Sequence, residues 1–133
     1  MNEEKLKIGF IGAGRVADVH YHALVKYIDM AKLVAFCDVR PDAIDDRQEE
    51  WNAPGFQTVD AMLDEVELDA VVVLLPHNIH LKVIEKCLAR KLPVLLEKPL
   101  AANLEEAEKI VELVEESEVP GLGGHNGLFH PAM

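Results

Sequence analysis

The sequence from Lys5 to Ala17 reads KLKIGFIGAGRVA, an apolar strand followed at once by the glycine turn Gly12-x-Gly14-x-x-Ala17. Gly12 permits a tight reversal of the chain, and Gly14 has no side chain to obstruct a phosphate. The small Ala17 allows the following helix to pack closely on the strand. The backbone N–H groups and the positive dipole end of that helix would then face the phosphates. This stretch predicts a strand-turn-helix unit that binds the pyrophosphate of a dinucleotide.

An acid at the end of the next strand strengthens this interpretation. The segment KLVAFCD places Asp38 directly after an apolar run and 24 residues after Gly14. That is about the spacing of the carboxylate that binds the adenosine ribose in dinucleotide folds. A glycine turn by itself is weak evidence, because such turns occur wherever the backbone needs a positive φ. An ordinary strand-turn-helix therefore remains the alternative interpretation.

Helix and strand patterns alternate along the chain, as is typical of a parallel sheet covered on both faces. The run AVVVLL at residues 70–75 is apolar without alternation, as expected of a strand buried on both faces. The expected strands are Lys5–Ile11, Leu33–Cys37, a short one near Phe56–Gln57, Ala70–Leu75, Pro93–Leu96 and one near Gly121–His125. The expected helices are Arg15–Ile28, Pro41–Trp51, Val59–Glu65, Ile79–Arg90 and Leu104–Ser117. We expect an α/β fold: a Rossmann doubly wound parallel sheet of six strands in the order 3-2-1-4-5-6, with helices on both faces.

Three features indicate how these helices begin. Asn103 followed by Glu106 resembles a capping box, and Thr58 is suited to cap the third helix. Pro41 is expected in the first turn of the second helix.

Composition excludes several classes of function. The chain has 133 residues, one domain in length, and a formal net charge of −11, which argues against nucleic-acid or anionic-membrane partners. No apolar run approaches the roughly 18 residues of a membrane span, and the first residues contain no apolar signal region. We therefore expect a cytoplasmic protein. Cys37 and Cys87 match no redox or metal spacing and are expected to be buried thiols, so no metal site is predicted.

Two further motifs follow the strands that should flank the crevice. The fourth strand continues into Pro76-His77-Asn78-Ile79-His80, and the fifth into Glu97-Lys98-Pro99-Leu100. Together with the glycine turn, these motifs resemble the glucose-fructose oxidoreductase and inositol dehydrogenase family (Gfo/Idh/MocA). The segment GHNGLFHP at residues 124–131 resembles that family's crossover into a substrate domain. The resemblance implies a dinucleotide-binding Rossmann domain at residues 1–126, with residues 127–133 starting the crossover to a further domain.

The resemblance also implies hydride transfer between a nicotinamide cofactor and a sugar, cyclitol or related polyol. Lys98 is the expected catalytic residue, because its ammonium at the crevice can bind a ribose hydroxyl or the oxygen of a substrate alcohol. Glu97 would orient Lys98, and capping of the following helix remains the alternative for Asn78. The expected cofactor-binding residues are Gly12, Ala13, Gly14, Arg15, Val16, Asp38, Arg40, Leu75, Pro76, His77, Asn78, His80, Glu97, Lys98 and Asn126.

The cofactor is expected to be NAD, because a carboxylate at Asp38 accepts hydrogen bonds from both ribose hydroxyls and repels a 2′-phosphate. Arg40 leaves NADP possible, since a guanidinium under the adenosine ribose can accommodate that phosphate.

Other hypotheses remain open at this stage. The chain is expected to be inactive alone, as an excised domain or a truncated gene product of a dehydrogenase. A non-catalytic dinucleotide-binding module, such as a sensor or a partner subunit, is the main alternative. An S-adenosylmethionine methyltransferase is another, although Ala17 and Glu97-Lys98-Pro99 disfavour it. Exposed Leu128, Phe129 and Met133 are expected to lead either to disorder beyond about Asn126 or to self-association as a homo-oligomer.

Overall fold

Six parallel strands form one sheet in the computed structural model, which describes residues 5–27, 29–75, 80–96, 104–118 and 121–123. The strands are β1 (Leu6–Ile11), β2 (Ala31–Cys37), β3 (Gly55–Phe56), β4 (Ala70–Val73), β5 (Val94–Leu96) and β6 (Gly121–Gly123). The helices are α1 (Arg15–Tyr27), α2 (Pro41–Trp51), α3 (Val59–Glu65), α4 (His80–Ala89) and α5 (Leu104–Ser117). The predicted alternation of strands and helices is confirmed.

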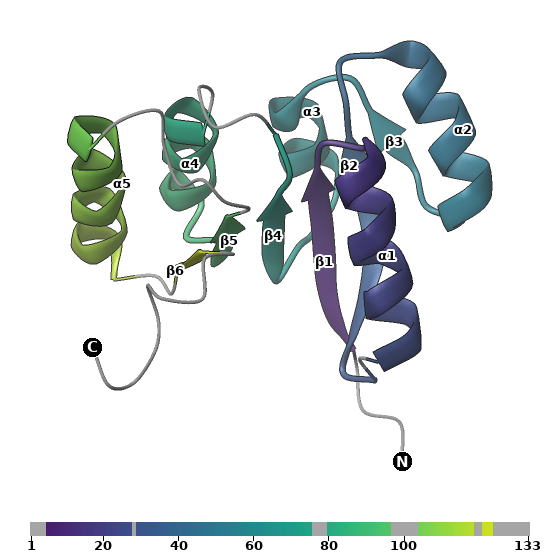
Figure 1. The fold of residues 1–133 in the computed structure, drawn as a ribbon, viewed down its shortest axis with the longest axis horizontal. Coiled ribbons are helices and arrows are strands. Elements are labelled where there is room, and N and C mark those ends of the chain that lie inside the picture. Colours follow the sequence, from purple (N-terminus) through teal and green to yellow (C-terminus); the bar gives the residue numbers. More distant parts are fainter. Residues whose placement is uncertain (1–4, 28, 76–79, 97–103, 119–120, 124–133) are drawn as a thin grey trace.

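The strand order is β3-β2-β1-β4-β5-β6, as the sequence predicted (Figure 1). Each neighbouring pair of these described strands runs parallel. Ile11, the last residue of β1, is in register with Cys37 of β2 and Val73 of β4. The carboxyl ends of the three central strands therefore meet at one edge of the sheet, where the order reverses.

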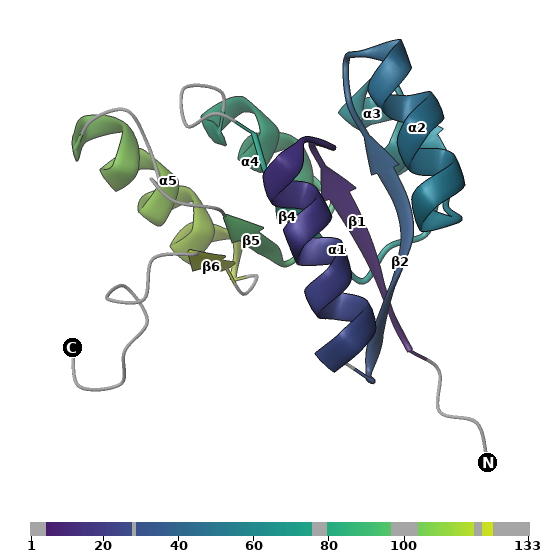
Figure 2. The same ribbon diagram turned by 45° about the vertical axis from the view of Figure 1, so that its right-hand side comes forward.

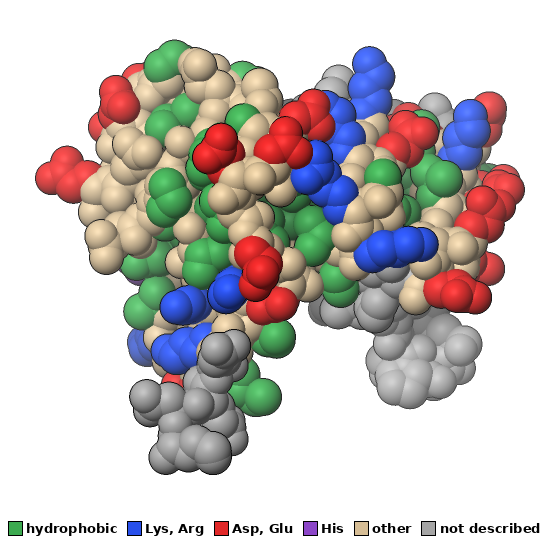
Figure 3. All heavy atoms as spheres, turned by 180° about the vertical axis from the view of Figure 1, so that it is seen from behind, with side chains coloured by type: hydrophobic (Ala, Val, Ile, Leu, Met, Phe, Trp, Pro, Cys, Tyr) green, Lys and Arg blue, Asp and Glu red, His purple; other side chains and the backbone are tan. Residues whose placement is uncertain are grey.

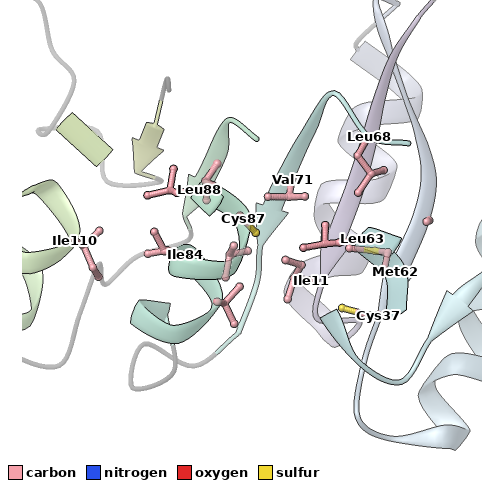
Figure 4. Close-up of a cluster of buried hydrophobic side chains, with 14 residues drawn as sticks. Ile11, Cys37, Met62, Leu63, Leu68, Val71, Ile84, Cys87, Leu88 and Ile110 are labelled. Carbon is pink, nitrogen blue, oxygen red and sulfur yellow. The ribbon is translucent and has the colours of Figure 1, made fainter. Parts of the chain in front are cut away.

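Neighbouring residues of each strand supply the cores on the two faces of the sheet. Phe10 and Phe36 pack with Trp51 and the buried residues of α1 and α2. Ile11 and Cys37, one position further along, pack in the other cluster with α3, α4 and α5. Figure 4 shows this second cluster reaching from β1 to α5, and Figure 2 shows α1 in front of the strands. The sheet is thus covered by helices on both faces, as expected.

The face that carries α3 and α4 has acidic and basic side chains interspersed over it (Figure 3). Lys86 of α4 lies 2.8 Å from Asp60 of α3, and Arg90 pairs with Asp64 one turn further along each helix. Exposed pairs of this kind contribute only about 0–1 kcal/mol each, so the apolar cluster beneath them holds the two helices on the sheet. Among the described residues, no helix combines the length and apolar character required to cross a membrane.

Some element boundaries differ from those expected. β2 begins at Ala31 rather than Leu33, because Ala31 and Lys32 pair with the start of β1 at the exposed end of the sheet. β4 ends at Val73 rather than Leu75, although the Leu74 N–H still donates to the Ile11 carbonyl at 2.7 Å. Residue 28 and residues 124–125, the expected ends of α1 and β6, lie outside the described residues.

The helix-start predictions are partly confirmed. Thr58 caps α3 by accepting a hydrogen bond from the Ala61 N–H at 3.0 Å, and Pro41 is the first residue of α2. Arg40 is the N-cap of α2 and makes no capping hydrogen bond with its side chain. Asn103 lies outside the described residues.

Candidate dinucleotide-binding site

The glycine turn lies between the end of β1 at Ile11 and the start of α1 at Arg15. Gly12 has a φ of +109°, a backbone conformation that side-chain-bearing residues rarely adopt. Its N–H donates to the Cys37 carbonyl at 2.9 Å, which extends the pairing of β1 with β2 into the turn. The first turn of α1 is therefore held at the carboxyl edge of the sheet, with its N-terminal N–H groups at that edge.

Asp38, directly after β2, is joined to this turn. One carboxylate oxygen, Oδ2, accepts a hydrogen bond from the Ala13 N–H at 2.9 Å. The other, Oδ1, accepts one from the Arg40 N–H, also at 2.9 Å. Asp38 is buried, with 8% of its surface exposed. The Asp38 carboxylate at the end of β2 is thus hydrogen-bonded to the glycine turn.

The side chain of Arg40 forms a forked pair with the same carboxylate. Nε donates to Oδ1 and Nη2 to Oδ2, each at 3.1 Å. Burial alone would raise the pKa of Asp38, but the hydrogen bonds from Arg40 and from the Ala13 N–H outweigh it and hold the pKa below its usual value. The hydrogen bonds from the Arg40 side chain to Asp38 raise the pKa of Arg40. The carboxylate is ionised at neutral pH and repels a second negative charge.

The two partners of this pair differ in exposure. The Arg40 side chain is 57% exposed, whereas that of Asp38 is 7% exposed. A ligand hydroxyl that donates to Asp38 can therefore replace the guanidinium, which water can then solvate.

A cleft opens at this edge between the turn, the end of β2 and the start of α3. The residues that line it are Ile11, Gly12, Ala13, Gly14, Cys37, Asp38, Val39, Arg40, Gln57, Thr58, Val59, Leu74 and Leu75. Above Gly14 the nearest atom that an added Cβ would meet is Arg40 Nη2, at 3.9 Å. The backbone of the turn is therefore open to the cleft at the position where a phosphate must approach.

The cleft brings together six of the residues predicted from sequence: Gly12, Ala13, Gly14, Asp38, Arg40 and Leu75. Arg15 and Val16 form the exposed start of α1, and His80 is the first residue of α4. β5 ends at Leu96, one position before Glu97. The remaining predicted residues lie outside the described residues: Pro76, His77, Asn78, Glu97, Lys98 and Asn126.

Sequence reasoning missed part of the site. Gln57, Thr58 and Val59 line the cleft because they follow the carboxyl end of β3, which pairs with β2 at the same edge. The strand-end rule that located Asp38 applies to them too, but a strand of two residues carries almost no pattern. Arg47 of α2, which contacts the glycine turn from outside the cleft, had no sequence signal at all.

The model of the oxidoreductase family with an NAD-binding Rossmann fold, Gfo/Idh/MocA, matches residues 6–123 of this chain. The chain belongs to this family. Its fold and its resemblance to a nucleotide-binding domain, both expected from sequence, are thereby confirmed. The S-adenosylmethionine methyltransferase alternative is removed by the same match.

Several relatives of this chain are inositol dehydrogenases. The chain is 31% identical to myo-inositol 2-dehydrogenase of Thermotoga maritima over 93% of its own length, and 35% identical to inositol 2-dehydrogenase of an Arthrobacter species over 84%. These matches cover 37% and 34% of the two relatives. The chain therefore spans little more than a third of the proteins that it resembles.

Solved structures give the same assignment. Scyllo-inositol dehydrogenase of Lactobacillus casei, with bound NAD(H) and scyllo-inositol, superposes with a TM-score of 0.85 at 27% identity, covering 97% of this chain and 38% of that one. The WlbA dehydrogenase of Bordetella pertussis, in complex with NADH and UDP-GlcNAcA, superposes with a TM-score of 0.86 at 28% identity over 90% and 37%. The chain is thus an oxidoreductase NAD-binding domain, similar to those of inositol and sugar dehydrogenases.

Proposed function

We propose that this chain supplies the cofactor half of a dehydrogenase that exchanges hydride between NAD and a hydroxyl or ketone of a sugar, cyclitol or related polyol. The observation that carries the proposal is the Asp38 carboxylate, which is buried beside the glycine turn and bonded to the Ala13 N–H. Asp38 and the glycine turn line one cleft, which supports the proposal that they bind the ribose and the pyrophosphate of the cofactor. Bound NAD would supply the nicotinamide carbon that accepts or donates the hydride.

The described residues fit the adenosine half of the cofactor. In our proposal the two ribose hydroxyls donate to Asp38 and displace the exposed Arg40 guanidinium. The pyrophosphate lies over Gly14, where the backbone is open, and accepts hydrogen bonds from the N-terminal N–H groups of α1. The carboxylate disfavours a 2′-phosphate, so NAD is the proposed cofactor, and NADP would depend on Arg40.

The remaining assignments are proposals from the sequence. Lys98 handles the proton of the substrate alcohol, and Glu97 orients it. Pro76, His77, Asn78, His80 and Asn126 contact the nicotinamide half. Residues 1–126 form the nucleotide-binding domain, and residues 127–133 lead toward a substrate domain. The relatives are nearly three times as long as this chain, which leaves room for such a domain. A cytoplasmic location and a homo-oligomeric state are proposed on the same basis.

The test is calorimetric titration of the 133-residue chain with NAD. Asp38→Ala should weaken NAD binding about tenfold or more, since hydrogen bonds to a charged group contribute about 1.5–3 kcal/mol. Asp64→Ala is the matched control, because Asp64 is an exposed acid of α3 that pairs with Arg90 and does not line the cleft. Equal NAD affinity in the Asp38 and Asp64 variants would remove Asp38 from the site.

A second titration separates the two cofactors. Arg40→Ala should leave NAD affinity unchanged or slightly improved, because the competitor for Asp38 is gone. If the wild-type chain binds NADP at all, the same variant should weaken that binding. A large loss of NAD affinity in Arg40→Ala would show that the guanidinium binds the cofactor instead of yielding to it.

Turnover separates the dehydrogenase from the non-catalytic module. We expect the 133-residue chain to bind NAD and to form no NADH with myo-inositol or scyllo-inositol. Fusing the chain to the substrate domain of an inositol dehydrogenase should restore NADH formation. A fusion that binds NAD and inositol but forms no NADH would favour the sensor or partner-subunit alternative.

A further inference from the structure

Arg47, a partly buried arginine on α2, contacts the glycine turn from outside the cleft. Arg47 Nε donates to the Ala13 carbonyl at 3.1 Å, and Nη2 donates to the Gly14 carbonyl at 3.4 Å. These contacts join residues 33 and 34 positions apart in the chain. One planar guanidinium therefore spans two successive carbonyls of the turn, which the point charge of a lysine could not do.

The guanidinium is itself fixed on all sides. Nη1 lies 3.3 Å from Asp18 Oδ1 and donates to Glu50 Oε2 at 3.0 Å. Its carbon lies 5.1 Å from the centre of the Trp51 ring, and the Trp51 indole N–H donates to the same Asp18 oxygen at 3.2 Å. Only 17% of the Arg47 side chain is exposed. A side chain this constrained holds its partners in one geometry.

The consequence for the turn follows from peptide geometry. In a trans peptide the carbonyl of one residue and the N–H of the next point in opposite directions. Fixing the carbonyls of Ala13 and Gly14 toward α2 therefore points the N–H groups of Gly14 and Arg15 the other way. On the preceding peptide, Asp38 holds the Ala13 N–H. The Gly14 carbonyl also accepts a hydrogen bond from the Asp18 N–H at 3.2 Å, so Arg47 and the first helical bond of α1 fix the Gly14–Arg15 peptide together. Asp38 and Arg47 thus contact three successive peptide planes of the turn, one from either side.

We infer that Arg47 is a positioning residue for cofactor binding: it orients the Gly14 and Arg15 N–H groups toward the pyrophosphate without touching the cofactor. This inference rests on the proposed function, because it assumes that the pyrophosphate binds at the turn. The competing interpretation is purely structural, with Arg47 joining α1 to α2 through Asp18.

The experiment compares Arg47→Met and Arg47→Lys with the control Arg90→Met, which removes an arginine paired with Asp64 on the opposite face. The probes are NAD, ADP-ribose and adenosine, of which only the first two carry a pyrophosphate. Arg47→Met should weaken NAD and ADP-ribose about tenfold and adenosine less than about twofold. In Arg47→Lys, the ammonium can still pair with Asp18, so the melting temperature should stay close to that of the wild type. The variant should nevertheless bind NAD and ADP-ribose almost as weakly as Arg47→Met does.

A readout without any ligand accompanies the titrations. In the free protein, the amide resonances of Gly14 and Arg15 should move in both Arg47 variants and stay in place in Arg90→Met. The inference is overturned if these amides do not move, or if folded Arg47→Lys binds NAD as tightly as Arg90→Met does. An equal loss for adenosine and ADP-ribose would also overturn it. Should the wild-type chain bind no NAD while the amides move as expected, the proposed function fails and the orienting contact stands.

Discussion

Replacing Gly12 by alanine tests the geometry of the turn most severely. An added Cβ would lie 2.8 Å from the Leu74 carbonyl oxygen and 3.0 Å from the carbonyl carbon, closer than real Cβ contacts come. This backbone cannot easily retreat, because the Leu74 N–H donates to the Ile11 carbonyl at 2.7 Å. The substitution therefore creates a steric clash between the segments that follow β1 and β4.

The magnitude follows from three terms. A residue with a side chain held at a φ of +109° costs about 1–3 kcal/mol, and a weakened strand-pairing hydrogen bond costs about 0.5–1.5 kcal/mol more. Alanine also restricts the unfolded chain, which offsets roughly 0.4–1 kcal/mol. The net loss should be about 1–3 kcal/mol. For a domain of this size it lowers the melting temperature by roughly 3–12 °C.

Thermal unfolding followed by circular dichroism measures this loss, with Gly14→Ala as the matched control. Gly14 lies two residues away, its added Cβ would meet nothing closer than Arg40 Nη2 at 3.9 Å, and its φ lies outside the left-handed range. Gly14→Ala should unfold within about 2 °C of the wild type while losing NAD affinity, because its methyl group enters the space of the pyrophosphate. Wild-type stability in Gly12→Ala, or equal destabilisation in both variants, would refute this account of the turn.

Two further predictions concern ionisable groups. Because the pKa of Asp38 is held below its usual value, its carboxylate stabilises the fold above pH 3.8 and that stabilisation is lost as the pH falls through the folded-state pKa. In urea unfolding, Asp38→Asn should be less stable than the wild type at neutral pH, and the difference should shrink steadily below pH 3.8; a constant difference would contradict the pairing. Burial raises the pKa of both Cys37 and Cys87 to about 12, so neither thiol forms a thiolate at pH 8 in the folded chain. A chromogenic disulfide reagent should label them only as the protein unfolds in urea, and rapid labelling of the native chain would show that one is accessible.

Much of the fold was predictable because its signals are local. The apolar run at residues 70–75 and the strand before Gly12 each carry their pattern within a few residues, and parallel topology fixes the rest. The polar start of β2 at Ala31–Lys32 was missed because pairing there depends on the partner strand. In the short strand β3, Gly55 lies against Phe36 and Ile44, where an added Cβ would meet carbon atoms at 2.7 Å. That close approach is a property of packing, which a sequence pattern does not encode.

The candidate site was likewise predictable only in part. Gly12 and Asp38 were predicted together because each follows the carboxyl end of a strand at a characteristic spacing. The forked pair between Arg40 and Asp38 was not predicted, since it depends on how the chain turns into α2. Arg47 was missed because any of several exposed positions of α2 could have faced the turn. Only the packing of α2 beside α1 determines which residue does so.

The most direct test of the central claim is a titration of the 15N-labelled chain with NAD, followed by amide NMR. We predict saturable shifts of the Ala13, Gly14 and Arg15 amides, together with those next to Asp38. The amides of α5, on the opposite face of the sheet, should remain in place. Shifts confined to residues away from the glycine turn, or none at saturating NAD, would contradict the assignment of this cleft as the dinucleotide-binding site.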